Sequence, residues 1–211
     1  MRGLYLVTDR GLCGNRLLED VAHKALMGGA AGIQLREKDV STRFFVEEAR
    51  QMKALTTKFC VPLIINDRID VALASGADGV HIGQDDMPYA EARRLMGPRA
   101  IIGLSVETWN DVVEAEVLDV NYLGVSPVFE TPTKTDTKGN WGLEGLAKIK
   151  AYSRHPLVAI GGMNASNAKE AVTAGADCIA VVSAICAAPD PLRASREINE
   201  IILAALKKRG A

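Results

Sequence analysis

The chain has 211 residues, 48% of them hydrophobic, and its 25 basic and 26 acidic residues leave a formal net charge of −1. This length and apolar content predict a single domain over residues 1–211 with one sizeable core. The near-neutral charge, with its only dense basic cluster in the short tail 207–209, argues against nucleic acid or a membrane as the main partner.

The N-terminal segment 1–9 is predicted to enter a strand directly. Its apolar run is too short for a signal peptide or a membrane span, so a cytoplasmic protein is expected. The four cysteines show no C-x-x-C spacing, and Cys60 and Cys178 lie in apolar segments typical of strands. We therefore expect neither a structural disulfide nor a zinc site.

A recurring phrase, found at 28–33, 75–80 and 174–179, indicates how the chain is organised. Each copy places a glycine where a helix would end and an apolar run where a strand would begin. The intervals between the copies fit two and four units of about 24 to 25 residues, close to a compact strand-helix repeat. The whole chain then holds eight such units.

Strands and amphipathic helical segments alternate along the entire sequence. The predicted strands are 3–8, 32–36, 62–66, 79–83, 101–104, 121–125, 157–160 and 178–182. Such alternation implies parallel strands with right-handed crossovers, and eight units favour a closed (βα)8 TIM barrel over an open sheet. Functional residues of this fold lie at the C-terminal ends of the strands.

The second predicted strand ends in alternating polar residues, Gln34, Arg36 and Lys38. An extended chain points every second side chain to the same face, so these three share one face. Two cations there suit a phosphate group, because Arg offers a planar fork of donors and Lys a point charge. The alternative is an exposed edge strand with a solvated basic face.

Two aspartates follow neighbouring strands. Asp67 comes after the third strand and Asp86 after the fourth, so they can converge on one Mg²⁺ ion, which takes few protein carboxylates and completes its shell with water and phosphate oxygens. Both also precede helices, where Asp is a favoured N-cap, and Pro88 suits a first helical turn. A metal-diphosphate site beside the Arg36 face explains both aspartates jointly.

Ser105 follows the fifth strand and can donate to a phosphate oxygen or cap a helix that begins near Glu107. The sixth strand leads into the longest loop, 129–142, which suits a lid that closes over anions but could also be a solvated excursion. Within it, Lys134 is the better functional candidate than Lys138 because it lies closer to the strand end.

Gly162 and Ser183 follow the seventh and eighth strands, where many such barrels bind phosphate through backbone N–H groups. The glycine could instead serve only a tight turn. A phosphate site there, apart from the diphosphate site, implies two phosphorylated substrates. His81 is interpreted as a packed strand residue with no catalytic role, and Trp141 as a packing residue.

These motifs together resemble the thiamine-phosphate synthase family over nearly the whole chain. The matching segments are 4–9, 34–38, 66–67, 81–86, 103–105, 131–134, 161–162 and 182–183. The resemblance implies that hydroxymethylpyrimidine diphosphate is coupled to thiazole phosphate, or to its carboxythiazole form, and that thiamine phosphate and pyrophosphate are released. No general base is needed if the pyrimidine first ionises and the thiazole nitrogen then attacks.

The resemblance also implies roles for individual residues. The pyrimidine diphosphate would be bound by Gln34, Leu35, Arg36, Glu37, Lys38, Asn66, Ser105 and Lys134, with Asp67 and Asp86 holding Mg²⁺. Thiazole phosphate would be bound by Thr131, Pro132, Thr133, Gly162, Val182 and Ser183. The charged or hydroxyl-bearing members Arg36, Lys38, Ser105 and Lys134 are the catalytic candidates, since they can stabilise the departing pyrophosphate.

Two departures and two rival functions accompany this resemblance. Asn121 stands where relatives often carry Asp, and Ser126 where Gly is common. The rivals are a thiazole tautomerase on the same barrel and a non-catalytic sensor of a thiamine precursor. The first is disfavoured because the diphosphate and metal residues Lys38, Asp67, Asp86 and Lys134 are all present. The second is disfavoured because no partner surface is evident. Monomer and homo-oligomer are both open.

Overall fold

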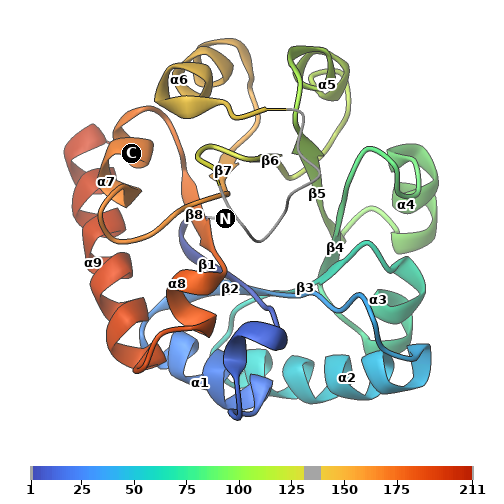
Figure 1. Ribbon diagram of the computed structural model, residues 1–211. Helices are drawn as coiled ribbons and strands as arrows, with labels where there is room; N and C mark the ends of the chain where they lie inside the picture. Colours follow the sequence, from blue (N-terminus) through green and yellow to red (C-terminus); the bar gives the residue numbers. More distant parts are fainter. Residues whose placement is uncertain (1, 131–138, 211) are drawn as a thin grey trace.

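The protein is described here by a computed structural model, which covers residues 2–130 and 139–210. Eight parallel strands in this part of the chain form a closed barrel in sequential order, with β1 paired to β8, and helices surround it (Figure 1). The strands are β1 (Gly3–Val7), β2 (Ala30–Leu35), β3 (Leu63–Asn66), β4 (Gly79–Ile82), β5 (Ile101–Val106), β6 (Tyr122–Val125), β7 (Leu157–Ala159) and β8 (Cys178–Val181). The predicted (βα)8 barrel is confirmed.

Each strand is followed by a helical segment, as the repeat predicted. These are η1 (Gly11–Cys13), α1 (Leu18–Met27), α2 (Thr42–Lys58), α3 (Ile69–Ser75), α4 (Tyr89–Met96), α5 (Trp109–Ala115), α6 (Gly142–Tyr152), α7 (Ala168–Thr173), α8 (Ser183–Cys186) and α9 (Pro191–Arg209). Within the described residues, none of these helices has the length and apolar character needed to cross a membrane.

The predicted helix-to-strand joints are present. Gly76 caps α3 with φ +70°, and Gly29 and Gly175 follow α1 and α7 with φ of +94° and +126°, a region that favours glycine. Three details differ from prediction. Strand β2 begins at Ala30, two residues before its predicted start. Strand β5 continues to Val106, so Ser105 lies inside the strand, and Cys60 is exposed after α2 with φ +56° instead of lying in a strand.

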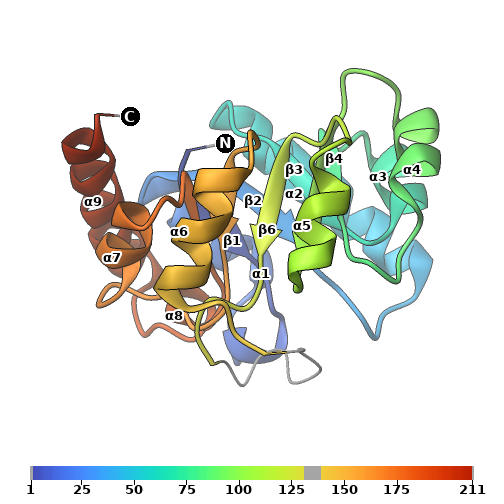
Figure 2. The ribbon, with the colours of Figure 1, turned by 90° about the horizontal axis from the view of Figure 1, so that it is seen from above.

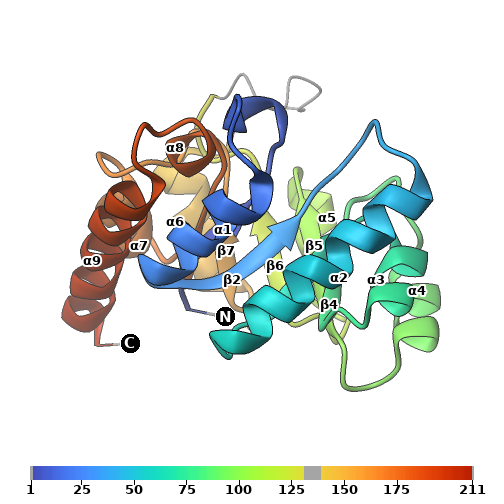
Figure 3. The ribbon, with the colours of Figure 1, turned by 90° about the horizontal axis from the view of Figure 1, so that it is seen from below.

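Apolar side chains on the strands pack in two directions. Leu4 and Leu6 of β1 belong to the large core between strands and helices, whereas Tyr5 and Val7 join a smaller cluster with Tyr122 inside the barrel. This alternation follows from the period of two in an extended chain. The loops at the C-terminal ends of the strands, including η1 and α8, lie together at one end of the barrel (Figures 2 and 3).

Candidate active site

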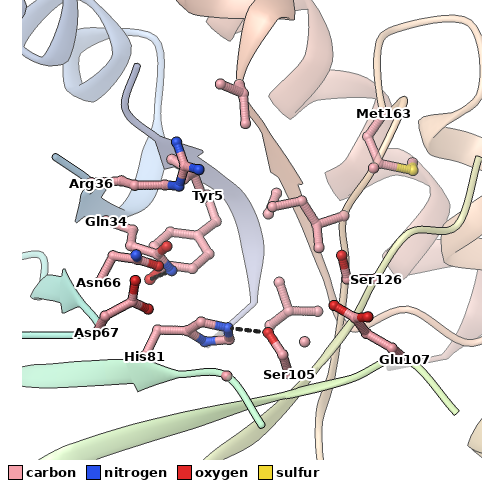
Figure 4. Close-up of a pocket in the computed structure, with 18 of the residues that line it drawn as sticks. Tyr5, Gln34, Arg36, Asn66, Asp67, His81, Ser105, Glu107, Ser126 and Met163 are labelled. Carbon is pink, nitrogen blue, oxygen red and sulfur yellow. Dashed lines mark hydrogen bonds between the residues drawn. The ribbon is translucent and has the colours of Figure 1, made fainter. Parts of the chain in front are cut away.

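A cavity of about 380 Å³ opens at the C-terminal end of the barrel. Residues of all eight strands, or of the loops directly after them, line it. Gln34, Arg36, Asn66 and Asp67 lie on one side and Met163, Ser126 and Glu107 on the other (Figure 4). The end of the barrel at which the fold places function therefore holds a hollow large enough for a small substrate.

Gln34, Arg36 and Lys38 all line this cavity, as the alternation predicted. Gln34 is buried and donates from Nε2 to the Tyr5 hydroxyl (3.1 Å), and the backbone N–H of Arg36 donates to Thr8 Oγ1 (3.0 Å). These bonds fix the backbone and one side chain of the wall. The guanidinium of Arg36 and the ammonium of Lys38 belong to residues that line the cavity, where they can meet an anion.

The intervening residues, Leu35 and Glu37, face the other way. Leu35 is fully buried in the core between barrel and helices, and the side chain of Glu37 contacts Arg10, with 3.1 Å between Arg10 Nη2 and Glu37 Oε1. Neither residue lines the cavity. The same alternation that directs Gln34 and Arg36 inward directs these two side chains outward, so the expectation that Leu35 and Glu37 bind substrate stays a prediction, and it can apply only to their backbone groups.

Asp67 and Asp86 lie close together at the rim, beside Asn66. Asp67 adopts φ +61°, an unusual conformation for a non-glycine residue, and its N–H donates to His81 O (2.8 Å). Burial and the neighbouring Asp86 raise the pKa of Asp67 to about 7, against the opposing charges of Lys38 and Arg36. A cation would relieve this repulsion between carboxylates.

Neither aspartate is the N-cap of a helix. Arg68 occupies that position for α3 and Pro88 for α4, and neither cap makes a side-chain hydrogen bond. Asp86 instead accepts the N–H of Gly83 through Oδ2 (2.7 Å), which holds its carboxylate at the end of β4. The capping interpretation therefore does not apply, and two carboxylates remain that suit a hard divalent cation.

Ser105 belongs to a hydrogen-bonded chain across the cavity floor. Its Oγ lies 2.9 Å from His81 Nε2, while His81 Nδ1 lies 3.0 Å from the Tyr122 hydroxyl, which in turn lies 3.3 Å from that of Tyr5. Burial raises the pKa of Tyr5 and Tyr122 above the usual range, so both hydroxyls stay protonated. Ser105 does not cap α5, because Thr108 does so in a capping box with Asp111.

His81 is the residue that sequence interpretation undervalued. It lines the cavity, and its ring stacks on that of Tyr122 with centroids 5.5 Å apart. Its partners come from β5 and β6, so no spacing within β4 could reveal them. Glu107 also lines the cavity, two residues after Ser105, and the period of two along β5 could have identified it.

The opposite side of the cavity is formed by the ends of β7 and β8. Gly162 has φ +64°, and a Cβ added to it would lie 2.7 Å from Glu130 O, so the position requires glycine for both its conformation and its close approach. Val182 and Ser183 line the cavity where the short helix α8 begins, as expected. Thr131, Pro132, Thr133, Lys134 and Lys138 lie outside the described residues. Trp141 donates from Nε1 to Val106 O (3.2 Å), consistent with packing.

Comparison with known proteins identifies the protein family. The family model for thiamine monophosphate synthase matches residues 4–185. The chain belongs to this family. It is 54% identical over 199 residues to the thiamine-phosphate synthase of Albidiferax ferrireducens, covering 94% of this chain and 91% of that one. It is also 54% identical over 199 residues to the Leptospira biflexa enzyme of the same name, covering 92% and 95%.

A solved structure supports the same family membership. Thiamine phosphate pyrophosphorylase from Pyrococcus furiosus superposes with a TM-score of 0.89 at 40% identity, covering 97% of this chain and 96% of that one. Both departures from the family pattern can now be located. Asn121 precedes β6 at the opposite end of the barrel, and Ser126 is a buried residue of the cavity wall that precedes a cis Ser126–Pro127 peptide bond.

Proposed function

We propose that this protein joins hydroxymethylpyrimidine diphosphate to thiazole phosphate, or to its carboxythiazole form, which must also lose its carboxylate as CO2, and releases thiamine phosphate and pyrophosphate. One observation carries the proposal. A single cavity holds a cationic wall with a carboxylate pair on one side and a glycine turn with a short helix on the other. Two phosphorylated substrates could therefore bind with their ring systems between these two sides.

The diphosphate fits the side formed by β2 to β5. Arg36 and Lys38 supply positive charge, Asn66 an amide, and Ser105 a hydroxyl. Asp67 and Asp86 would hold Mg²⁺, since their carboxylates lie together at the rim and burial has already raised the pKa of Asp67 to about 7. When bound, Mg²⁺ neutralises charge on the diphosphate oxygens.

The phosphate of the thiazole fits the other side. The backbone N–H groups near Gly162, Val182 and Ser183 offer donors at a place where barrels commonly bind phosphate. Apolar residues of the same side, Val158 and Ile160, suit the thiazole ring. Thr131, Thr133 and Lys134 are candidates for the remaining contacts on the basis of sequence alone.

The reaction needs positioning and charge stabilisation more than proton transfer. The carbon–oxygen bond of the pyrimidine methylene breaks and its electron pair leaves with pyrophosphate, whose growing charge Arg36 and Lys38 stabilise. The aminopyrimidine stabilises the methylene cation. The thiazole nitrogen carries no proton and attacks that carbon with its lone pair. His81 and the protonated Tyr122 then serve to hold the ring pocket in shape, with no general base required.

Turnover measured with both substrates tests the proposal. Purified protein, the two substrates and Mg²⁺ should give thiamine phosphate and pyrophosphate in equal amounts, and a chelator should stop both. Folded protein that binds either substrate without turnover would favour the tautomerase or sensor function instead.

The metal assignment has its own test. Asp67→Asn should weaken Mg²⁺ binding, measured by calorimetry, by at least about tenfold, because one of two charged ligands becomes neutral. Asp119→Asn removes the same charge from an exposed site at the opposite end of the barrel and serves as control. Equal Mg²⁺ affinity in the two variants would contradict the assignment.

A further inference from the structure

Glu37 sits between the two cations of the cavity wall but faces away from the cavity. Its side chain is only 5% exposed and lies 3.1 Å from the guanidinium of Arg10, which follows β1. The same guanidinium nitrogen of Arg10 contacts Glu48 of α2. Arg10 thus joins the end of β1 to the segment that carries Arg36 and Lys38, and to the helix that follows it.

Burying the charged side chains of Glu37 and Glu48 beside Arg10 is energetically unfavourable. Glu37 Oε1 and Glu48 Oε2 are buried, and in the described part of the chain neither accepts a hydrogen bond. Burial and the neighbouring Glu48 raise the pKa of Glu37, while Arg10 opposes that shift. The outer face of Arg10 lies over the Phe44 ring, 5.1 Å from its centre. A cluster of two buried carboxylates and one guanidinium is not expected to stabilise the fold strongly. It can instead position the residues next to it.

A second contact from the same segment supports that role. Thr8, which is fully buried, donates its N–H to Gln34 O (2.9 Å) and accepts the N–H of Arg36 through Oγ1 (3.0 Å). Thr8 therefore fixes the backbone of the wall at Gln34 and Arg36, and Arg10 contacts the side chain of Glu37, the next residue along. The segment that carries Arg36 is thus tied to the end of β1 at two points.

We propose that Arg10, acting through Glu37, positions Arg36 and Lys38 to bind the diphosphate group. Arg10 does not line the cavity and is a positioning residue, not a catalytic one. The proposal rests on the proposed function, since it takes the diphosphate as the ligand of this wall. It predicts a selective effect, because the ion pairs that Arg10 forms within residues 2–130 and 139–210 are with Glu37 and Glu48, on the diphosphate side of the cavity.

The test compares Arg10→Ala, Arg10→Lys and Glu37→Gln with wild type. Arg10→Ala should raise the KM for the pyrimidine diphosphate, and the Kd for inorganic pyrophosphate with Mg²⁺, by about tenfold, in line with the loss of an ion pair to a buried carboxylate. The KM for thiazole phosphate should stay within about twofold. Arg10→Lys keeps the positive charge but loses the planar pair of guanidinium donors, so its KM and Kd should lie between those of Arg10→Ala and wild type.

A double variant separates positioning from general weakening. Glu37→Gln should raise the same KM, and adding it to Arg10→Ala should cause little further loss, because both remove one contact. Arg94→Ala removes an exposed Arg–Glu pair on α4, 2.8 Å long, and serves as control. Calorimetric pyrophosphate binding needs no turnover, so it reports on Arg10 even if the synthase assay fails.

Unchanged pyrophosphate affinity in folded Arg10→Ala would overturn the proposal. So would an equal rise in both KM values, which indicates a merely structural role. If Arg10→Ala does not fold, Glu37→Gln and Thr8→Val decide the question. Thr8→Val keeps the side-chain volume but removes the acceptor for Arg36 N–H, and it should raise the same KM selectively.

Discussion

Two glycines make room for the aromatic side chains inside the barrel. A Cβ added to Gly103 of β5 would lie 2.1 Å from Tyr122 Cζ, and one added to Gly124 of β6 would lie 2.8 Å from His81 Cε1. Both distances are far below van der Waals contact. The hydrogen-bonded chain on the cavity floor therefore depends on two residues that have no side chain of their own.

Gly124→Ala tests whether the position of His81 matters for the reaction. The added methyl group must push the imidazole away, which strains or breaks its contacts with Ser105 (2.9 Å) and Tyr122 (3.0 Å). We expect a loss of stability of about 1–3 kcal/mol from overpacking. We expect kcat/KM to fall about tenfold, roughly the effect of misplacing one polar contact.

Thermal unfolding and steady-state kinetics give the two readings for Gly124→Ala separately. Destabilised protein with wild-type kcat/KM would mean that the His81 position contributes to folding alone. That result would remove the cavity floor from the functional description.

Individual site residues show which features could be predicted from the sequence and which could not. The inward direction of Gln34, Arg36 and Lys38 could be predicted from one strand, because alternation is a local property of an extended chain. The role of His81 could not, because its partners Tyr122 and Ser105 lie on two other strands. Asp67 and Asp86 were ambiguous between cap and ligand, and only the observed caps at Arg68 and Pro88 remove the first option.

At the level of elements, three polar residues close the N-terminal end of the barrel in the same way. Asp78, Asn121 and Asp177 each precede an even-numbered strand and accept the N–H of a residue in the preceding odd-numbered strand. The partners are Leu63 (2.8 Å), Ile102 (2.8 Å) and Leu157 (2.9 Å), respectively. Lys53, Arg93 and Lys150 then donate to the same three side chains.

Asn121 is the neutral member of this set, and its place explains why the departure from the family pattern is tolerated. An amide oxygen accepts the Ile102 N–H as a carboxylate would, and only the charge facing Arg93 is lost. Such an exposed pair contributes little to stability. Two copies of the joint phrase, 75–80 and 174–179, also contain residues of this set, Asp78 and Asp177, whereas Asn121 lies outside the copies.

Asp177→Asn should lower the free energy of unfolding at pH 7 by about 2 kcal/mol, since a buried carboxylate hydrogen-bonded to Lys150 and Arg209 becomes neutral. Burial alone would raise the pKa of Asp177, but the Lys150 and Leu157 hydrogen bonds and the charges of Lys150 and Arg209 outweigh it, so the pKa is lowered. The carboxylate therefore stabilises the fold above its unfolded pKa of about 3.9, and this contribution is lost as pH falls through the lower folded pKa.

Urea unfolding of wild type and Asp177→Asn measures this dependence between about pH 3 and about pH 7, a range that includes the unfolded pKa of about 3.9. The difference between the two proteins should be constant near neutrality and shrink below about pH 4. A difference that does not change with pH would show that the carboxylate acts through shape and not through charge.

The order of elements was predictable because each strand-helix unit repeats the same local signals. Glycine after a helix, an apolar run, and polar residues at the strand end recur closely enough for strand positions to be read within a few residues. The largest differences, of two residues each, are at the start of β2 and at the end of β5. The extension of β5 through Ser105 to Val106 depends on pairing with β6, where Ser105 lies opposite Gly124, and pairing partners are not visible in one segment.

On the scale of the whole molecule, the two halves of the barrel supply different parts of the cavity. The cationic wall and the carboxylate pair come from β2 to β4, and the glycine turn and α8 come from β7 and β8 (Figure 1). Closing the sheet brings these halves face to face across the barrel. A ligand that bridges groups of one half should stabilise the entire fold, because the described strands form one continuous hydrogen-bonded ring.

Magnesium and pyrophosphate added together should therefore raise the midpoint of thermal unfolding more than the sum of their separate effects. A ligand at about 100 times its Kd stabilises the native state by about 2.7 kcal/mol. For a chain of this size, each kcal/mol shifts the midpoint by about 2–4 °C, so a rise of about 5–10 °C is expected. Each ligand alone should raise the midpoint by a smaller amount. Without Mg²⁺, Asp67 and Asp86 repel the diphosphate, and without the diphosphate, Mg²⁺ lacks the phosphate oxygens that it prefers in its coordination shell. Asp67→Asn should reduce the joint effect to the sum of the separate ones. Strictly additive shifts in the wild type would instead mean that the carboxylate pair and the Arg36 wall bind their ligands independently, and the two would then not form one metal-diphosphate site.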